Sequence, residues 1–206
     1  MGHIPLDLPP PAALRGRWAA SAAIAHATGH GTGCWADGPL WHYDDGGGNW
    51  LQLHHTGRGR AVLLGHDHEC SPEPEETPDL LAGAPPWWHP PVREAVAAHE
   101  FLGFVYGFDG TGWWRAPYDV HDGFTDIGLP ALSAERTRQR ITDACSYDPT
   151  TGRHAPHRPL PQAASIDALI AADAEVDATL VAAVIGPHGG DPQAGAAAAR
   201  AFLGAP

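Results

Sequence analysis

Apolar residues recur along the chain with two different periods, which predict helices near both ends and strands in the middle. A spacing of three or four residues is typical of a helix with one buried face. This spacing, together with Pro, Ser and Gly at the expected ends, predicts helices over residues 11–28, 91–100, 133–145, 165–185 and 192–203. The first and last of these are rich in alanine.

Two pairs of β-forming segments are each separated by a short glycine-containing stretch. The segments 50–55 and 60–66 flank Thr56-Gly57-Arg58-Gly59, and the segments 101–108 and 113–118 flank Asp109-Gly110-Thr111-Gly112. Both patterns predict β-hairpins with four-residue loops. With 35–43 as a further strand, they predict an α+β fold in which a central antiparallel sheet of four to five strands packs with N-terminal and C-terminal helices.

The register of the first hairpin decides which side chains share a face of the sheet. If His55 pairs with Arg60, the numbers of paired residues add up to 115. One face then carries Leu51, Leu53, Val62 and Leu64, and His66 and His68 lie further along this same face.

The remaining segments suggest how the chain is organised. A stretch rich in proline and acidic residues, 71–91, is expected to form a surface loop, which Trp87 and Trp88 could attach to the body of the protein. Residues 148–163 are expected to be a proline-rich linker that leads to a C-terminal helical pair at 164–203. We expect all 206 residues to form a single α+β domain.

The composition excludes two classes of enzyme. All twelve basic residues are arginine, and alanine, glycine and proline are abundant, which is typical of a GC-rich, bacterial coding genome. Without lysine the chain can form neither the Schiff base of a pyridoxal phosphate enzyme nor the phosphate loop of a Walker A motif.

The charge and the cysteines indicate the kind of partner and the compartment. A formal net charge of −12 argues against nucleic-acid binding and favours a basic protein partner. The three cysteines, Cys34, Cys70 and Cys145, lack the spacing of a disulfide framework or a zinc ribbon, which fits a reducing cytoplasm. The N-terminus lacks the pattern of a signal peptide, and no apolar run is long enough to cross a membrane, so we expect a cytoplasmic protein.

The densest cluster of metal-binding residue types surrounds the open end of the first hairpin. His66 ends one strand and His68 follows it, while Asp44 and Asp45 precede the other strand and could supply oxygen ligands. Such a mixed set is compatible with a divalent transition metal such as zinc, manganese or iron. The alternative is a polar strand end whose histidines bond to loop backbone.

Three weaker groups of residues complete the candidates. His26, His30 and Cys34 are spaced by four residues and could form a metal site at a helix end. Tyr106, Trp113, Trp114 and Tyr118 could line a ligand pocket or fill the core. Cys70 follows an acidic stretch that should raise its thiol pKa, which makes it a poor nucleophile.

These observations favour a protein that binds another protein over an enzyme. Exposed acidic side chains would contact a basic partner at Glu69, Glu73, Glu75, Glu76 and Asp79. The predicted architecture and the negative charge are analogous to those of immunity proteins and antitoxins, which neutralise toxins. The alternative function is a metal-dependent hydrolase or oxygenase that uses His66, His68 and a carboxylate.

Overall fold

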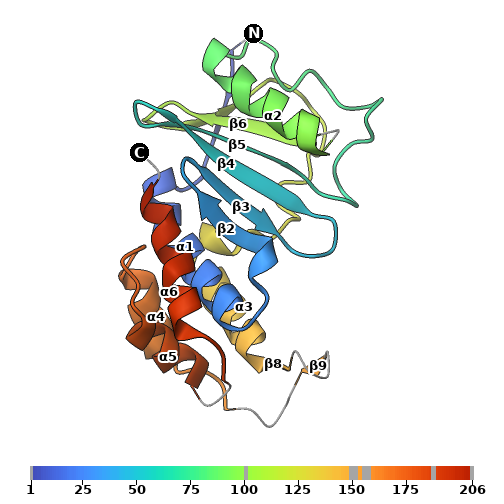
Figure 1. The fold of residues 1–206 in the computed structure, drawn as a ribbon. Coiled ribbons are helices and arrows are strands. Elements are labelled where there is room, and N and C mark those ends of the chain that lie inside the picture. Colours follow the sequence, from blue (N-terminus) through green and yellow to red (C-terminus); the bar gives the residue numbers. More distant parts are fainter. Residues whose placement is uncertain (1, 100–101, 149–152, 155–158, 187–188, 205–206) are drawn as a thin grey trace. The chain divides into compact units, whose positions relative to one another are not determined.

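The computed structural model describes residues 2–99, 102–148, 153–154, 159–186 and 189–204. It confirms the α+β class: helices are combined with a seven-stranded antiparallel sheet in the order β1-β7-β6-β5-β4-β3-β2 (Figure 1). The prediction of four to five strands is therefore too low. The strands are β1 (Ile4–Leu6), β2 (Cys34–Asp37), β3 (Leu40–Asp44), β4 (Trp50–Gly57), β5 (Arg60–His66), β6 (Phe104–Phe108) and β7 (Trp113–Arg115).

The chain divides into two compact units, each of which is built from separate parts of the sequence. The first contains residues 1–10, 39–128 and 206, and the second contains residues 11–38 and 129–205. The first unit holds β1, β3 to β7, the 3₁₀ turn η2 (Pro86–Trp88) and α2 (His89–His99). Much of the predicted linker, at 149–152 and 155–158, lies outside the described residues.

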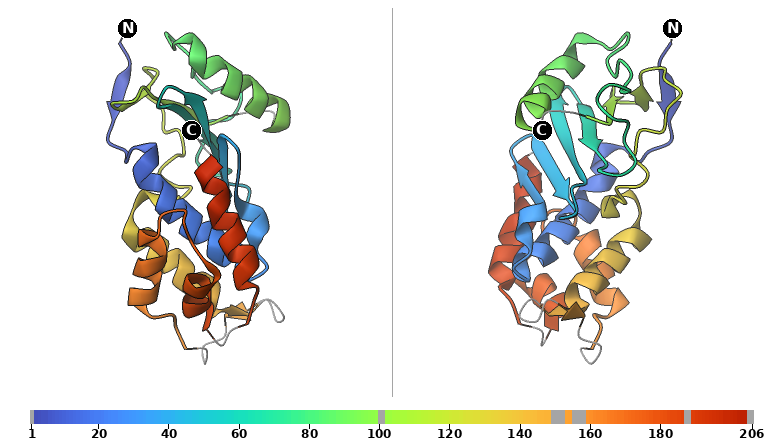
Figure 2. Two further views of the ribbon diagram at one scale, coloured as in Figure 1. Left: turned by 60° about the vertical axis from the view of Figure 1, so that its left-hand side comes forward. Right: turned by 90° about the vertical axis from the view of Figure 1, so that its right-hand side faces the viewer.

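The first unit packs α2 against one face of its strands, as both views in Figure 2 show. We call this face the helix-covered face. Its apolar core consists of Trp50, Val62, Leu64, Leu80, Trp88, Ala95, Leu102 and Val105. Leu53, Leu63 and Phe104 point to the opposite face and are also buried. The central strands therefore carry buried apolar side chains on both faces.

The predicted register of β4 and β5 is wrong by one residue. The pairs are Leu53 with Leu63 and Gln52 with Leu64, whose numbers add up to 116. The loop is a two-residue turn, Arg58-Gly59, in which both residues have positive φ, and a bulge between His55 and Gly57 adds one residue to β4.

The one-residue shift separates the four leucine and valine side chains that the prediction placed together. Val62 and Leu64 lie on the helix-covered face, whereas Leu51 and Leu53 point the other way. His66 pairs with Trp50 and therefore lies on the helix-covered face too.

The second unit is helical and is arranged around α1 (Pro11–Ala27). Consecutive residues of α1 from Trp18 to Ile24 are buried, which is typical of a helix surrounded by others. Its neighbours are α3 (Ala134–Ser146), α4 (Ala163–Ala171), α5 (Ala178–Ile185) and α6 (Pro192–Arg200). The two-residue strands β8 (Tyr147–Asp148) and β9 (Arg153–His154) pair with each other.

One predicted helix is divided into two. The segment 165–185 was expected to be continuous, but α4 ends at Ala171, and Asp173 adopts a positive φ of 55°. The side chain of Asp177 then accepts a hydrogen bond from the backbone N–H of Leu180 and starts α5. None of the helices in the described ranges has the length and apolar character that crossing a membrane requires.

Candidate functional site

A pocket of about 330 Å³ in the first unit is walled by three tryptophans and one carboxylate. Its lining residues are His3, Pro85, Trp87, Trp88, Asp109 and Trp114. They come from four places in the sequence: the residue before β1, the η2 turn, the β6–β7 turn and β7. Pockets that bind small molecules begin at about 300 Å³.

The η2 turn presents two neighbouring indoles. Pro85 has an extended conformation, and its carbonyl accepts a hydrogen bond from the N–H of Trp88 at 3.0 Å. Trp88 is only 1% exposed and lies directly on Gly107 of β6, where a Cβ atom would come within 2.2 Å of the indole ring. The Trp87 ring stands edge-on to that of Trp88 at 5.8 Å, so the two rings form adjoining walls.

Asp109 is held as an anion by the turn that it begins. Its Oδ1 accepts hydrogen bonds from the N–H and hydroxyl of Thr111 and from the N–H of Gly112, while Oδ2 accepts one from the indole N–H of Trp114 at 3.0 Å. The bonds from Thr111 contribute most to lowering the pKa of this carboxyl group. Among the described residues, no ion pair neutralises Asp109.

The other polar groups of the pocket surround the same indoles. The His3 imidazole stacks on Trp88 with 5.5 Å between ring centroids, and its buried Nε2 atom has no hydrogen-bond partner among the residues that the structure describes. The guanidinium of Arg60 lies 5.1 Å from the centroid of Trp87, which shows that this ring already interacts with a cation.

The predicted acidic contact surface belongs to the same unit. Glu69, Glu73, Glu75, Glu76 and Asp79 are all exposed. The segment is anchored at its end, since Leu80 is buried in the core of the helix-covered face. It therefore presents its carboxylates to solvent shortly before the chain reaches Pro85 and the two tryptophans.

Of the four aromatic residues predicted to line a pocket, Trp114 lines this one. Tyr106 and Tyr118 instead donate their hydroxyl groups to Oδ2 of Asp122, at 2.6 and 2.8 Å. Trp113 is 1% exposed and donates its indole N–H to the carbonyl of Pro9. These three side chains hold together neighbouring segments of the chain.

The four residues predicted to bind a metal have different surroundings. His66 ends β5, while His68 is exposed, and its backbone N–H donates to the side chain of Asn49. Asp44 and Asp45 accept hydrogen bonds from glycine N–H groups of their own loop. Among the described residues, these four do not come together as a group of three potential ligands.

The second predicted metal site consists of His26, His30 and Cys34. In the part of the chain that the structure describes, these three residues do not form a group of potential ligands either. His26 is within hydrogen-bonding distance of the carbonyl oxygen of Cys34, at 3.1 Å. The ring of His30 lies edge-on to that of Tyr147. Burial raises the pKa of the Cys34 thiol to about 12, so this group stays protonated in the absence of a metal.

Sequence reasoning found Trp114 but missed the other lining residues of the pocket, because they are distant in sequence. The signal was the pair Trp87-Trp88 near the end of a proline-rich loop, since large aromatics in such a loop need a reason to be there. Comparison with known proteins adds no further information, because no family model, curated protein or solved structure matches the chain.

Proposed function

We propose that this chain is an acidic binding module that captures a basic protein partner by taking one of its cationic side chains into the tryptophan pocket. The observation that carries this proposal is an ionised Asp109 in the wall of a pocket formed by Trp87, Trp88 and Trp114. A basic toxin is the partner class that the charge favours, and its neutralisation would be the biological outcome.

The chemistry of the pocket suits a positive charge on an apolar stem. The faces of indole rings attract cations, and each such contact contributes from about 0.5 to about 2 kcal/mol depending on how far the cation is desolvated. The carboxylate of Asp109 can add a charge-assisted hydrogen bond, whose geometry favours one orientation of the cation. The side chains of arginine, lysine and methylated lysine combine a cation with an aliphatic stem that can pack against indoles.

The acidic segment, residues 69–79, supports the same class of partner. Its five exposed carboxylates and the net charge of −12 create a negative field that would speed the approach of a basic surface. In this division of roles, the segment increases the association rate, and the pocket slows dissociation. Binding should consequently weaken as salt is added.

The experiment uses short peptides of glycine and serine that carry one central residue: arginine, lysine, trimethyllysine or, as a neutral control, glutamine. Binding to the full chain is followed by calorimetry and by the NMR signals of the indole N–H groups. We expect at least one cationic peptide to bind at least tenfold more tightly than the glutamine peptide and to shift the Trp114 signal. Equal affinity for all four peptides would contradict the proposal.

Two variants locate the effect. Asp109→Asn removes the charge while keeping the shape of the side chain, and it should abolish the preference for the cationic peptide. Glu175→Gln removes an exposed carboxylate in the helical unit and serves as the matched control. If both variants bind the cationic peptide equally well, Asp109 does not recognise the ligand.

The role of the acidic segment is tested with a longer peptide that carries several arginines. Neutralising Glu73, Glu75, Glu76 and Asp79 together should lower the association rate constant at low salt and have little effect on the dissociation rate constant. An unchanged association rate would show that these carboxylates do not guide the partner.

A further inference from the structure

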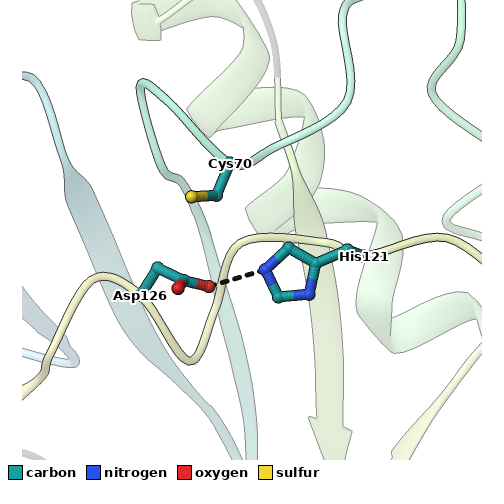
Figure 3. A group of neighbouring side chains, drawn as sticks. All are labelled: Cys70, His121 and Asp126. Carbon is teal, nitrogen blue, oxygen red and sulfur yellow. Dashed lines mark hydrogen bonds and ion pairs between the residues drawn. The ribbon is translucent and has the colours of Figure 1, made fainter.

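A cysteine, a histidine and an aspartate that are far apart in sequence meet in the first unit. The potential ligand atoms of Cys70, His121 and Asp126 all lie within 4.8 Å of one another. Figure 3 shows Cys70 on the loop that follows β5, opposite the loop that carries the other two residues. Nε2 of His121 donates to Oδ2 of Asp126 at 2.6 Å, and both side chains are at the surface.

The loop that carries Cys70 is fixed by a buried carboxylate. Asp67 is 2% exposed, and its Oδ1 accepts hydrogen bonds from the N–H groups of Glu69 and Cys70, at 3.0 and 2.8 Å. The backbone of Asp67 is bonded to Ser71 in both directions, through the Ser71 hydroxyl and the Ser71 N–H. The position of Cys70 is therefore set by a closed turn.

The second loop is locked onto the first. The Ser71 hydroxyl donates to the carbonyl of Asp122 at 3.0 Å, and the carboxylate of Asp122 accepts bonds from Tyr106 and Tyr118. Gly123, at a φ of +82°, lies so close that a Cβ atom would come within 2.7 Å of both Asp67 and Ser71. The two loops thus bring the three side chains close to one another, which lowers the cost of ordering them on binding.

The chemistry of this trio fits a metal ion. A cysteine sulfur, an imidazole nitrogen and a carboxylate oxygen are ligand types that zinc takes in proteins. The carboxylates of Asp126 and Asp67, which both lie close to Cys70, attract a divalent cation.

We propose that Cys70, His121 and Asp126 form a binding site for a divalent transition-metal ion of the zinc type. One sulfur, one nitrogen and one oxygen ligand leave a fourth tetrahedral position for water or for a group from a partner. On binding, a bond forms between the metal and the Cys70 sulfur, and the thiol proton is released to solvent.

The required movement is small. A tetrahedral ion with bonds of roughly 2.0–2.3 Å keeps its ligand atoms about 3.3–3.6 Å apart. The imidazole and carboxylate must move apart slightly from their hydrogen-bonded separation of 2.6 Å, while the remaining ligand atoms already lie within 4.8 Å. Exposure of His121 and Asp126 leaves room for this adjustment.

The test is a titration of the reduced, untagged full chain with Co²⁺, which takes the place of zinc and gives a charge-transfer absorption when bound to a thiolate. We expect this band to saturate at one ion per chain and to disappear when Zn²⁺ is added. Zinc should also slow the alkylation of Cys70, which mass spectrometry can follow. Absence of the band, or a band without change in Cys70 alkylation, would overturn the proposal.

Matched variants assign the ligands. Cys70→Ser should abolish the band, and His121→Gln and Asp126→Asn should each weaken Co²⁺ binding at least tenfold. Cys145→Ser and His68→Gln test a thiol and an imidazole outside the trio and should leave the titration unchanged. Should the band survive Cys70→Ser with its intensity intact, the metal is bound elsewhere. The Asp109→Asn variant keeps the site, which separates this test from that of the pocket.

Discussion

A hydrogen-bonded network that contains the buried His54 and the half-buried His99 should make the stability of the protein depend on pH. On the helix-covered face, Nε2 of His54 donates to Oε1 of Gln52 at 2.9 Å, and the Gln52 amide donates to Nε2 of His99 at 3.3 Å. In this arrangement His99 must accept, so its Nε2 carries no proton. Its ring also stacks on Trp50 with 3.9 Å between centroids, and His54 is only 9% exposed.

The size of the effect follows from His54. Burial, assisted by the nearby charge of His55, lowers the pKa of His54 from 6.5 to about 4. Below pH 6.5 the unfolded chain therefore binds a proton that the folded chain does not, and stability falls until the pH reaches about 4. At 1.36 kcal/mol per pKa unit, the total loss is about 3 kcal/mol, of which about 2 kcal/mol falls between pH 7 and pH 5. Burial lowers the pKa values of His42 and His99 as well, so they act in the same direction.

Urea unfolding at pH 7 and pH 5, followed by tryptophan fluorescence, measures this loss. His54→Gln keeps a donor for Gln52 but cannot titrate, so its free energy of unfolding should fall by about 2 kcal/mol less than that of the parent protein over the same interval. His68→Gln changes an exposed histidine and should behave like the parent. The reasoning is refuted if His54→Gln loses as much stability as the parent protein on acidification.

Three further predictions concern stability and can be measured by the same urea unfolding at pH 7. Leu53→Ala should cost about 2–5 kcal/mol, because Leu53 is fully buried opposite Leu63, and a cost below about 1 kcal/mol would contradict that packing. Ser133→Ala removes the hydroxyl that accepts the N–H of Arg136 at the start of α3, and should cost about 1 kcal/mol. Gly195→Ala should destabilise although alanine favours helices, because its Cβ would lie 2.5 Å from the carbonyl oxygen of Ala23, whereas the exposed Ala197→Gly should cost about 1 kcal/mol through helix propensity alone. A stabilising Gly195→Ala would refute the close packing of α6 on α1.

Much of the secondary structure could be predicted because its causes are local. The structure confirms the caps Ser133 and Asp191, whose side chains accept backbone N–H groups within the first turn of α3 and α6. Pro11 starts α1, as expected for a residue that needs no partner for a backbone N–H. Both hairpins also lie where two segments of β-forming residues flank a short stretch that contains glycine.

The prediction failed where a single residue changed the pairing. The sequence predicted a four-residue loop at 56–59, but Arg58 and Gly59 form a tighter turn, and Thr56 lies within the bulge. Because side chains alternate along a strand, this one residue moved Val62 and Leu64 away from Leu51 and Leu53. The strand β5 is apolar on both faces, so its pattern could not reveal which register is correct.

The sequence by itself determined the α+β class, the caps of α3 and α6, the acidic net charge and the enzyme classes that a chain without lysine cannot belong to. These properties follow from composition and from interactions between residues a few positions apart. Only the tertiary structure decided that Asp109 faces the indoles of Trp87 and Trp88, and that Cys70 meets His121 and Asp126. Such meetings depend on strand order and loop closure, which arise from packing between distant segments and leave no periodic trace in the sequence.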